Sequence, residues 1–256
     1  MHCAFVHLCM YVRMPPFESG ACNGSILPES NNSNPRALTA CFSGENMVAQ
    51  QGLFAWFKSS EIGESGYDDS KWVSLVGDFT AHPTSGTAKM SFSKPGHGAS
   101  AGLRTLKGEA SSAYTFGEIL ADKYTICSLT RYTGSRRGRI LTGSRTNWLH
   151  DHWRGRAGVA HYDGWLGSFD SRMTPATDWV ILCGTSKRLF LRGKEVASRS
   201  THVPGNQAVV INDGPYGRSE QSDWAVAEII TWNRELSEKE IQDASAYLQI
   251  VLEGEA

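Results

Sequence analysis

Short strand-like segments separated by turn residues fill the chain from residue 52 to residue 232. Each segment is rich in β-branched and aromatic residues, and Gly, Asn, Asp or Ser residues separate it from the next. This spacing predicts an antiparallel sandwich or barrel, because a parallel sheet would need a crossover between successive strands. GSRRG at 134–138 and TSK at 185–187 predict hairpin connections. The expected strands are residues 53–57, 71–76, 87–92, 112–120, 123–133, 138–143, 157–165, 178–185, 188–193, 207–212 and 224–232.

One helix is expected near the C-terminal end, from about residue 238 to residue 250. Ser237 and Glu240 have the spacing of a capping box, in which each side chain bonds to the other residue's backbone N–H. Behind them, apolar residues recur at the helical period. These residues are Ile241, Ala244, Ala246, Tyr247, Leu248 and Val251.

The last strand and this helix carry a family resemblance. WAVAEIITWNRELSEKEIQDASAYL, at 224–248, resembles the closing signature of laminin-G-like and concanavalin A-like jelly-roll domains. DWVILCGTSKRLFLRGKEV at 178–196 resembles the central hairpin of that family, and GLFAWFKSS at 52–60 looks like its first strand. The resemblance covers about residues 50 to 252, and it is weak between 60 and 170. The residues that match the closing signature are Glu228, Trp232, Asn233, Arg234, Leu236, Ser237, Glu240 and Ile241.

We therefore predict an all-β fold: a two-sheet antiparallel jelly-roll β-sandwich with one short C-terminal helix, over residues 46–256. Residues 1–45 are expected to form an irregular N-terminal extension or leader. Glu228 stands on an otherwise apolar strand face, so we expect it at the sheet edge or bonded to the following turn.

Composition narrows the function. A formal charge of −1 argues against a nucleic-acid binder, and no apolar run is long enough for a transmembrane segment. Glycosidases of related folds need two carboxylates spaced along a strand, but neither ExDxE nor ExDxxE is present, and GxSxG, zincin and phosphate-loop motifs are absent too. We therefore expect no enzymatic activity, and glycoside hydrolase is the least favoured reading.

NWLHDHW, at 147–153, is the most unusual stretch of the chain. If it is extended, Trp148, His150 and His152 share one face. Aromatic faces that stack on a sugar, beside polar side chains that bond its hydroxyls, would make a glycan site. A metal site that includes His161 and a core position for the tryptophans are the alternatives. The predicted ligand-binding residues are Asn147, Trp148, His150, His152, Trp153, Arg154, Tyr162 and Trp165.

Seven arginines and one acidic residue lie between residues 131 and 156. Such a local positive charge would attract sulfated or carboxylated glycans, or acidic proteins. The alternative is that strand alternation spreads the arginines over both faces. They are Arg131, Arg136, Arg137, Arg139, Arg145, Arg154 and Arg156.

Calcium is the candidate metal, although no motif requires a cofactor. The resemblance implies a calcium site at a loop rim, and Asp213, Glu220 and Asp223 provide hard oxygen ligands in a glycine-containing loop. A plain Asn-Asp-Gly turn explains the same residues equally well.

The cysteines and glycosylation acceptors indicate an oxidising compartment, so we expect an extracellular or cell-surface protein. Asn23 and Asn31 are formal acceptors. Cys127 and Cys183 lie in apolar strands, and the favoured reading is that they are inert core thiols.

Together these patterns predict a non-catalytic recognition module that binds a glycan, with a preference for anionic ones, or an extracellular protein. The alternative is a structural or adhesion domain of a larger, membrane-associated assembly, without a small-molecule ligand. The two differ in whether the tryptophans of NWLHDHW are exposed.

Overall fold

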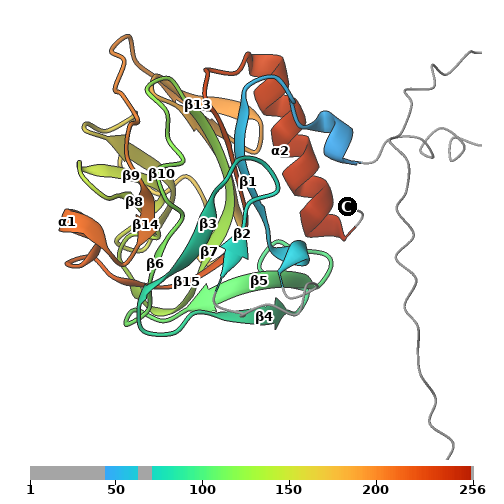
Figure 1. Ribbon diagram of the computed structural model, residues 1–256, viewed down its shortest axis with the longest axis vertical. Coiled ribbons are helices and arrows are strands. Elements are labelled where there is room, and N and C mark those ends of the chain that lie inside the picture. The colour runs from blue at the N-terminus through green and yellow to red at the C-terminus, as the bar shows by residue number, and fades with distance from the viewer. Residues whose placement is uncertain (1–43, 63–70, 255–256) are drawn as a thin grey trace, which may run out of the picture. The chain divides into compact units, whose positions relative to one another are not determined.

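The computed structural model describes residues 44–62 and 71–254, which belong to one compact unit, Cys41–Ala256. In this part of the chain two antiparallel sheets, one of eight strands and one of seven, form a sandwich (Figure 1). The predicted fold class is confirmed. The predicted N-terminal extension, residues 1–45, falls almost wholly outside the described residues. None of the described helices is long and apolar enough to cross a membrane.

Strands far apart in sequence are neighbours in both sheets. The eight-stranded sheet has the order β13-β12-β11-β7-β15-β5-β4, with β1 paired to β15, and the seven-stranded sheet has the order β10-β9-β8-β14-β6-β3-β2. The strands of the first sheet are β1 (Leu53–Lys58), β4 (Lys89–Ser93), β5 (Leu103–Gly108), β7 (Thr125–Arg137), β11 (Val180–Thr185), β12 (Arg188–Leu191), β13 (Lys194–Ser198) and β15 (Ser222–Trp232). Those of the second are β2 (Trp72–Val73), β3 (Thr80–Ser85), β6 (Ala113–Thr115), β8 (Leu141–Gly143), β9 (Trp148–Trp153), β10 (Arg156–Tyr162) and β14 (Val209–Ile211). The helical segments are η1 (Gly44–Met47), η2 (Ser59–Glu61), α1 (Gly214–Gly217) and α2 (Glu238–Glu253).

One predicted hairpin is confirmed and the other is wrong. The connection at 185–187 joins β11 to β12, which pair antiparallel. The segment 134–138 does not join a hairpin, because β7 and β8 belong to different sheets. The backbone N–H groups of Gly138 and Arg139 donate to the carbonyls of Gln221 and Glu220. The connection from β7 to β8 therefore runs beside the residues that precede β15.

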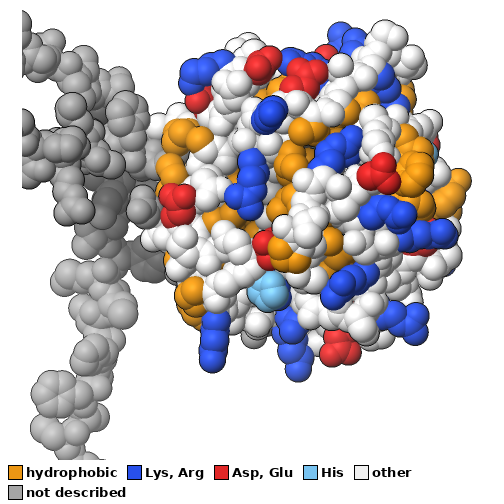
Figure 2. Space-filling view, turned by 180° about the vertical axis from the view of Figure 1, so that it is seen from behind, with side chains coloured by type: hydrophobic (Ala, Val, Ile, Leu, Met, Phe, Trp, Pro, Cys, Tyr) orange, Lys and Arg blue, Asp and Glu red, His pale blue; other side chains and the backbone are white. Residues whose placement is uncertain are grey.

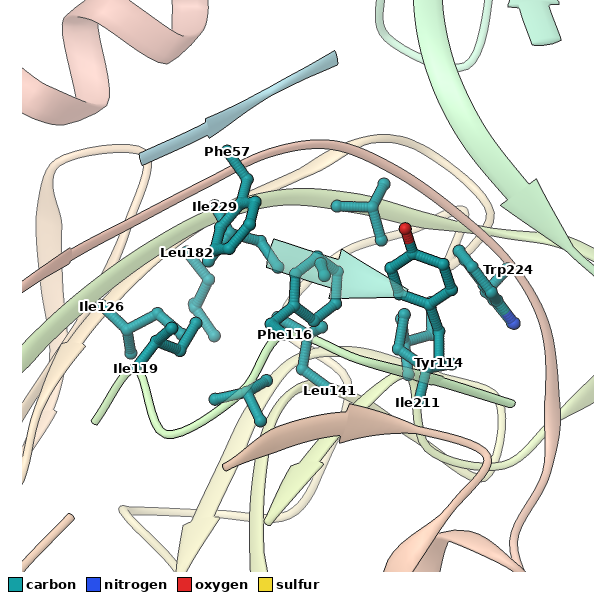
Figure 3. Packing of buried hydrophobic residues seen from close by; sticks show 14 of the residues in the cluster. Phe57, Tyr114, Phe116, Ile119, Ile126, Leu141, Leu182, Ile211, Trp224 and Ile229 are labelled. Atoms are coloured by element: carbon teal, nitrogen blue, oxygen red, sulfur yellow. The ribbon is translucent and has the colours of Figure 1, made fainter. Parts of the chain in front are cut away.

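The main core fills the space between the sheets. Phe57 from β1 meets Phe116, which follows β6, edge to face with ring centroids 5.3 Å apart (Figure 3). Phe116 in turn packs on Tyr114, at 5.4 Å. Trp224 of β15 is buried beside them and donates its indole N–H to the carbonyl of Ser112. Large aromatic side chains from both sheets therefore close the sandwich.

A second core lies on the outer face of the eight-stranded sheet, where α2 packs (Figure 1). The helix begins after Ser237 with the predicted capping box and ends at Gly254 in the left-handed conformation. Ile241, Tyr247 and Leu248 of its apolar stripe are buried against β7, β11 and β15. The helix extends three residues beyond the predicted end, to Glu253.

The prediction of two inert core thiols is wrong, because Cys127 and Cys183 form a disulfide. The two cysteines are register partners on neighbouring strands, β7 and β11. Their side chains point to the outer face, into the cluster under α2. The spacing of the two cysteines does not show which strands are neighbours, so it could not predict this disulfide.

Glu228 is neither at the edge nor bonded to the following turn. It is buried under α2, where its carboxylate accepts hydrogen bonds from the indole of Trp56 and the hydroxyl of Tyr247, both at 3.0 Å. Burial raises the pKa of Glu228 to about 7, although the two hydrogen bonds and nearby Lys58 act in the opposite direction. The last strand thus carries a buried carboxyl group held between β1 and the helix.

Glu228 makes the stability of the fold depend on pH. Because its pKa is raised from 4.5 in the unfolded chain to about 7, the folded state binds the proton more tightly, and stability falls as the pH rises through this range. The shift corresponds to an effect on the order of 3 kcal/mol. Urea unfolding of the wild type and Glu228→Gln at pH 5, 6, 7 and 8 should show the wild type losing stability relative to the variant as the pH rises. Parallel curves would contradict this assignment.

Candidate functional site

Trp148, His150 and Tyr162, three of the predicted ligand-binding residues, form a stack inside the sandwich. The rings of Trp148 and Tyr162 lie 5.1 Å apart with an interplanar angle of 13°, and Trp148 and His150 are stacked as well. All three side chains are fully buried. The indole N–H of Trp148 donates to the hydroxyl of Tyr124 at 2.9 Å. Burial lowers the pKa of His150 to about 4, so its ring is neutral at pH 7.

Asp151 and His152 are buried too, because β9 departs from simple alternation. Asp151 has a positive φ of 79°, and the register between β9 and β10 shifts at Gly158. The carboxylate of Asp151 therefore turns inward and accepts a hydrogen bond from Thr130 of β7 at 2.7 Å. Its other oxygen lies 2.8 Å from Nδ1 of His152.

The structure corrects half of the predicted site. Four of its eight residues belong to the core and leave no surface for a ligand. The physical reason is that β9 turns Trp148, His150 and His152 toward the other sheet, where His150 reaches β11 and His152 packs on Tyr132 of β7. These four residues are Trp148, His150, His152 and Tyr162.

The two other predicted aromatic residues, Trp153 and Trp165, meet His161 and Phe169 near the surface. Trp153, His161, Trp165 and Phe169, here called the aromatic patch, form one chain of ring contacts. The centroids of Trp153 and Trp165 lie 4.9 Å apart, those of Trp165 and Phe169 5.8 Å, and those of His161 and Trp165 5.0 Å. Phe169 is 47% exposed. An exposed aromatic ring beside half-buried tryptophans makes this patch a candidate interaction site.

A tight turn after β10 builds the patch. Asp163 and Gly164 both have positive φ, and the backbone N–H of Tyr162 bonds to the carbonyl of Gly164 at 3.0 Å. The chain is thereby turned back so that Trp165 pairs with His161 in an isolated bridge. Trp153, at the end of β9, then meets Trp165 from the turn after β10.

Arginines border the patch. The guanidinium carbon atoms of Arg154 and Arg156 each lie 5.1 Å from the ring centroid of Trp153, and that of Arg156 lies 5.6 Å from Phe169. Such cation–π contacts combine flat apolar faces with N–H donors. Asn147 lies at the same rim, where its side-chain oxygen accepts from Arg139 at 2.8 Å.

Glu220 ties this border together. It accepts hydrogen bonds from Nε of Arg139 and Arg154 and from the indole N–H of Trp153. Burial alone would raise the pKa of Glu220, but the hydrogen bonds from these donors outweigh it and hold the pKa below its ordinary value. Glu220 is therefore an ionised carboxylate that fixes the orientation of Trp153 and the arginines.

The seven arginines do not form one patch. Arg131 lies on the outer face of the eight-stranded sheet, Arg139 is buried at Glu220, and Arg145 bonds to Glu118. Figure 2 shows Lys and Arg side chains distributed singly among hydrophobic and uncharged ones on one face. Arg139, Arg154 and Arg156 contact Glu220 or Trp153, whereas Arg131 and Arg145 have other partners, so the arginines are spread as the second reading of the sequence predicted.

The three predicted calcium ligands do not converge. Asp213 caps α1 and accepts from Thr84 and Arg218, and Asp223 accepts from the backbone N–H groups of Ala110 and Arg136. Glu220 is committed to the arginines. Among residues 44–62 and 71–254, no group of three or more His, Cys, Asp and Glu side chains could hold a metal ion. Hydrogen-bond donors of the chain already bind the carboxylate oxygens of these three residues, which calcium would need as ligands.

Phe169 and the bordering role of Arg156 escaped the sequence analysis. Phe169 ends the glycine-containing segment DGWLGSF at 163–169, where two aromatic residues stand four apart in a turn-rich stretch. This spacing of two aromatic residues could have indicated the patch, because large aromatic residues in turns have little core to enter.

Comparisons with known proteins show the fold alone. No family model and no curated protein matches the chain. Domain 4 of AbnA, an extracellular arabinanase of Geobacillus stearothermophilus solved with arabinotriose, is similar with a TM-score of 0.53 and 13% identity, over 75% of this chain and 98% of that one. Trypanosoma rangeli sialidase in complex with 2,3-difluorosialic acid is similar with a TM-score of 0.51 and 12% identity, over 80% of this chain. The match spans only 34% of the sialidase chain.

The two classes of tryptophan should respond differently to truncation. Trp148→Ala removes a fully buried ring and should cost about 3–5 kcal/mol in the free energy of unfolding. Trp165→Ala, on the outside, should cost less than about 1.5 kcal/mol. Denaturant unfolding measures both values. A Trp148→Ala protein of wild-type stability would show that the ring is not part of the core.

Proposed function

We propose that this domain is a non-catalytic recognition module that binds a glycan through the aromatic patch. The observation that carries the proposal is the run of rings from Trp153 to Phe169, in which Phe169 is exposed and the two tryptophans are half-buried, bordered by Arg154 and Arg156. The apolar face of a sugar ring would stack on Trp165 and Phe169. Arg154, Arg156 and Asn147 would donate to its hydroxyl groups or to a carboxylate or sulfate.

Two further points support this proposal. The sandwich is shared with domain 4 of AbnA, which was solved with arabinotriose. The carboxylate at the patch, Glu220, is held ionised by three side-chain donors, which suits it for orienting other groups and not for delivering a proton. The laminin-G-like assignment is part of the same proposal and rests on residues 224–248.

A glycan array tests the proposal with three proteins. The wild type should bind a defined set of glycans, with anionic ones preferred because of the bordering arginines. Trp165→Ala and Phe169→Ala should weaken that binding more than about tenfold, since loss of an aromatic anchor costs about 2 kcal/mol or more. Leu75→Ala is the matched control, because Leu75 is 49% exposed, close to the 47% of Phe169, and stands outside the patch.

Two results would contradict glycan binding through the aromatic patch. Unchanged binding by both patch variants would exclude the aromatic patch as the glycan site. No binding by the wild type, with or without calcium, would favour the adhesion function, in which the same rings contact a protein.

We also propose an extracellular or cell-surface location, which the disulfide Cys127–Cys183 supports because reducing compartments disfavour such bonds. Alkylation of the unfolded natural protein followed by mass spectrometry should modify Cys127 and Cys183 only after reduction. Their modification without reductant would contradict both the bond and the location.

A further inference from the structure

A cavity of about 280 Å³ opens on the outer face of the eight-stranded sheet, beyond the area covered by α2. Arg131 of β7 and Lys107 of β5 are both register partners of Ala225 in β15, so they stand two strands apart on either side of a residue with a small side chain. Neighbouring strands are about 4.8 Å apart, which places the two backbones roughly 10 Å from each other. Two cationic side chains thus border one depression in the sheet.

Arg131 and Thr133, two of the residues that line this cavity, carry unpaired donors. Nε and Nη1 of Arg131 and the hydroxyl of Thr133 are covered from solvent and have no hydrogen-bond partner among the described residues. One side of the guanidinium group is occupied by Trp179, whose ring centroid lies 5.6 Å from the guanidinium carbon. Covered donors without an acceptor cost about 1–3 kcal/mol each. A small rotation of these two side chains toward an acceptor in the cavity would remove that penalty.

The charge around the cavity favours an anion. Lys94, Lys107 and Arg131 line it, and no Asp or Glu is among its described lining residues. Asp178 is the acidic residue nearby, and it lies 3.8 Å from Nδ1 of His97 at the rim. Burial lowers the pKa of Arg131, whereas Asp178 acts in the opposite direction, and the guanidinium group remains charged at pH 7.

A second cavity continues from the first. It has a volume of about 590 Å³, shares Ser91 and Lys107 with the smaller one, and adds Lys89 and Glu109. Lys89 and Lys107 are register partners on β4 and β5. The two cavities are therefore adjacent, and together they are here called the groove, with the residues that carry unpaired donors in the smaller cavity.

We propose that Arg131, Thr133 and Lys107 form a binding site for an oxyanion group, a sulfate or carboxylate, separate from the aromatic patch. Thr133 and Arg131 donate to the oxyanion, and Lys107 adds charge. The group is carried by a saccharide whose remaining rings lie along the groove toward Lys89. The oxyanion site stands on its own geometry, and only the identity of the carrier rests on the proposed function.

Nitrogen-15 NMR of the arginine side chains tests the oxyanion site directly. The Nε–H signal of Arg131 is assigned by its loss in Arg131→Lys. Sodium sulfate should move this signal along a saturable curve, whereas sodium chloride of equal ionic strength should not. Thr133→Val, first checked for a wild-type unfolding temperature, should weaken sulfate binding about tenfold, because one donated hydrogen bond to a charged group is worth about 1.5 kcal/mol or more. Arg136→Gln, an exposed arginine on the same strand, should leave the curve unchanged.

An absent or linear response, or an equal response to both salts, would overturn the site, and so would an unchanged affinity in Thr133→Val. A second titration compares a sulfated disaccharide with its unsulfated form. Tighter binding of the sulfated form than of inorganic sulfate supports the saccharide carrier, and equal affinity overturns that part. These outcomes are independent of the aromatic patch, because Trp165→Ala and Phe169→Ala leave the groove intact.

Discussion

The pairing of β7 with β15 is the interaction on which the rest of the structure depends. These two long strands run through the middle of the eight-stranded sheet, and both of their faces are used. One face closes the main core against the second sheet, and the other carries the disulfide, the buried carboxyl of Glu228 and the packing of α2. Because two cores share one pair of strands, a change in their register would disturb both at once.

This central pair also determines where recognition can occur. The strand β9 lies across from β7, and the polar side chains on the inner face of β7 receive its Asp151, while His150 reaches the backbone of β11. The polar and aromatic residues of NWLHDHW are thus mostly committed to the interior. What remains for a ligand is the end of β9 and the segment after β10, where Phe169 is exposed and two half-buried tryptophans lie beside arginines. The proposed groove lies elsewhere, on the outer face of the same eight-stranded sheet.

The sequence predicted the fold far better than the site. Strand composition and the capping box at Ser237 are local signals, and they identified the sandwich and the helix directly. Three features were beyond local reasoning. The left-handed conformation of Asp151 reversed the expected face of one side chain, the crossing at Gly138 depended on partners near residue 220, and the pairing of Cys127 with Cys183 required the strand order. Alternation correctly separates inner from outer positions only where no bulge intervenes.

We propose that ligand recognition uses the rings outside the core and spares those within it. The indole N–H signals of the eight tryptophans report on both classes in one experiment. In a titration with a glycan selected on the array, the signals of Trp153 and Trp165 should shift, and the signal of Trp148 should stay in place. A glycan that binds while Trp153 and Trp165 remain unmoved, or that shifts Trp148 alone, would contradict the account.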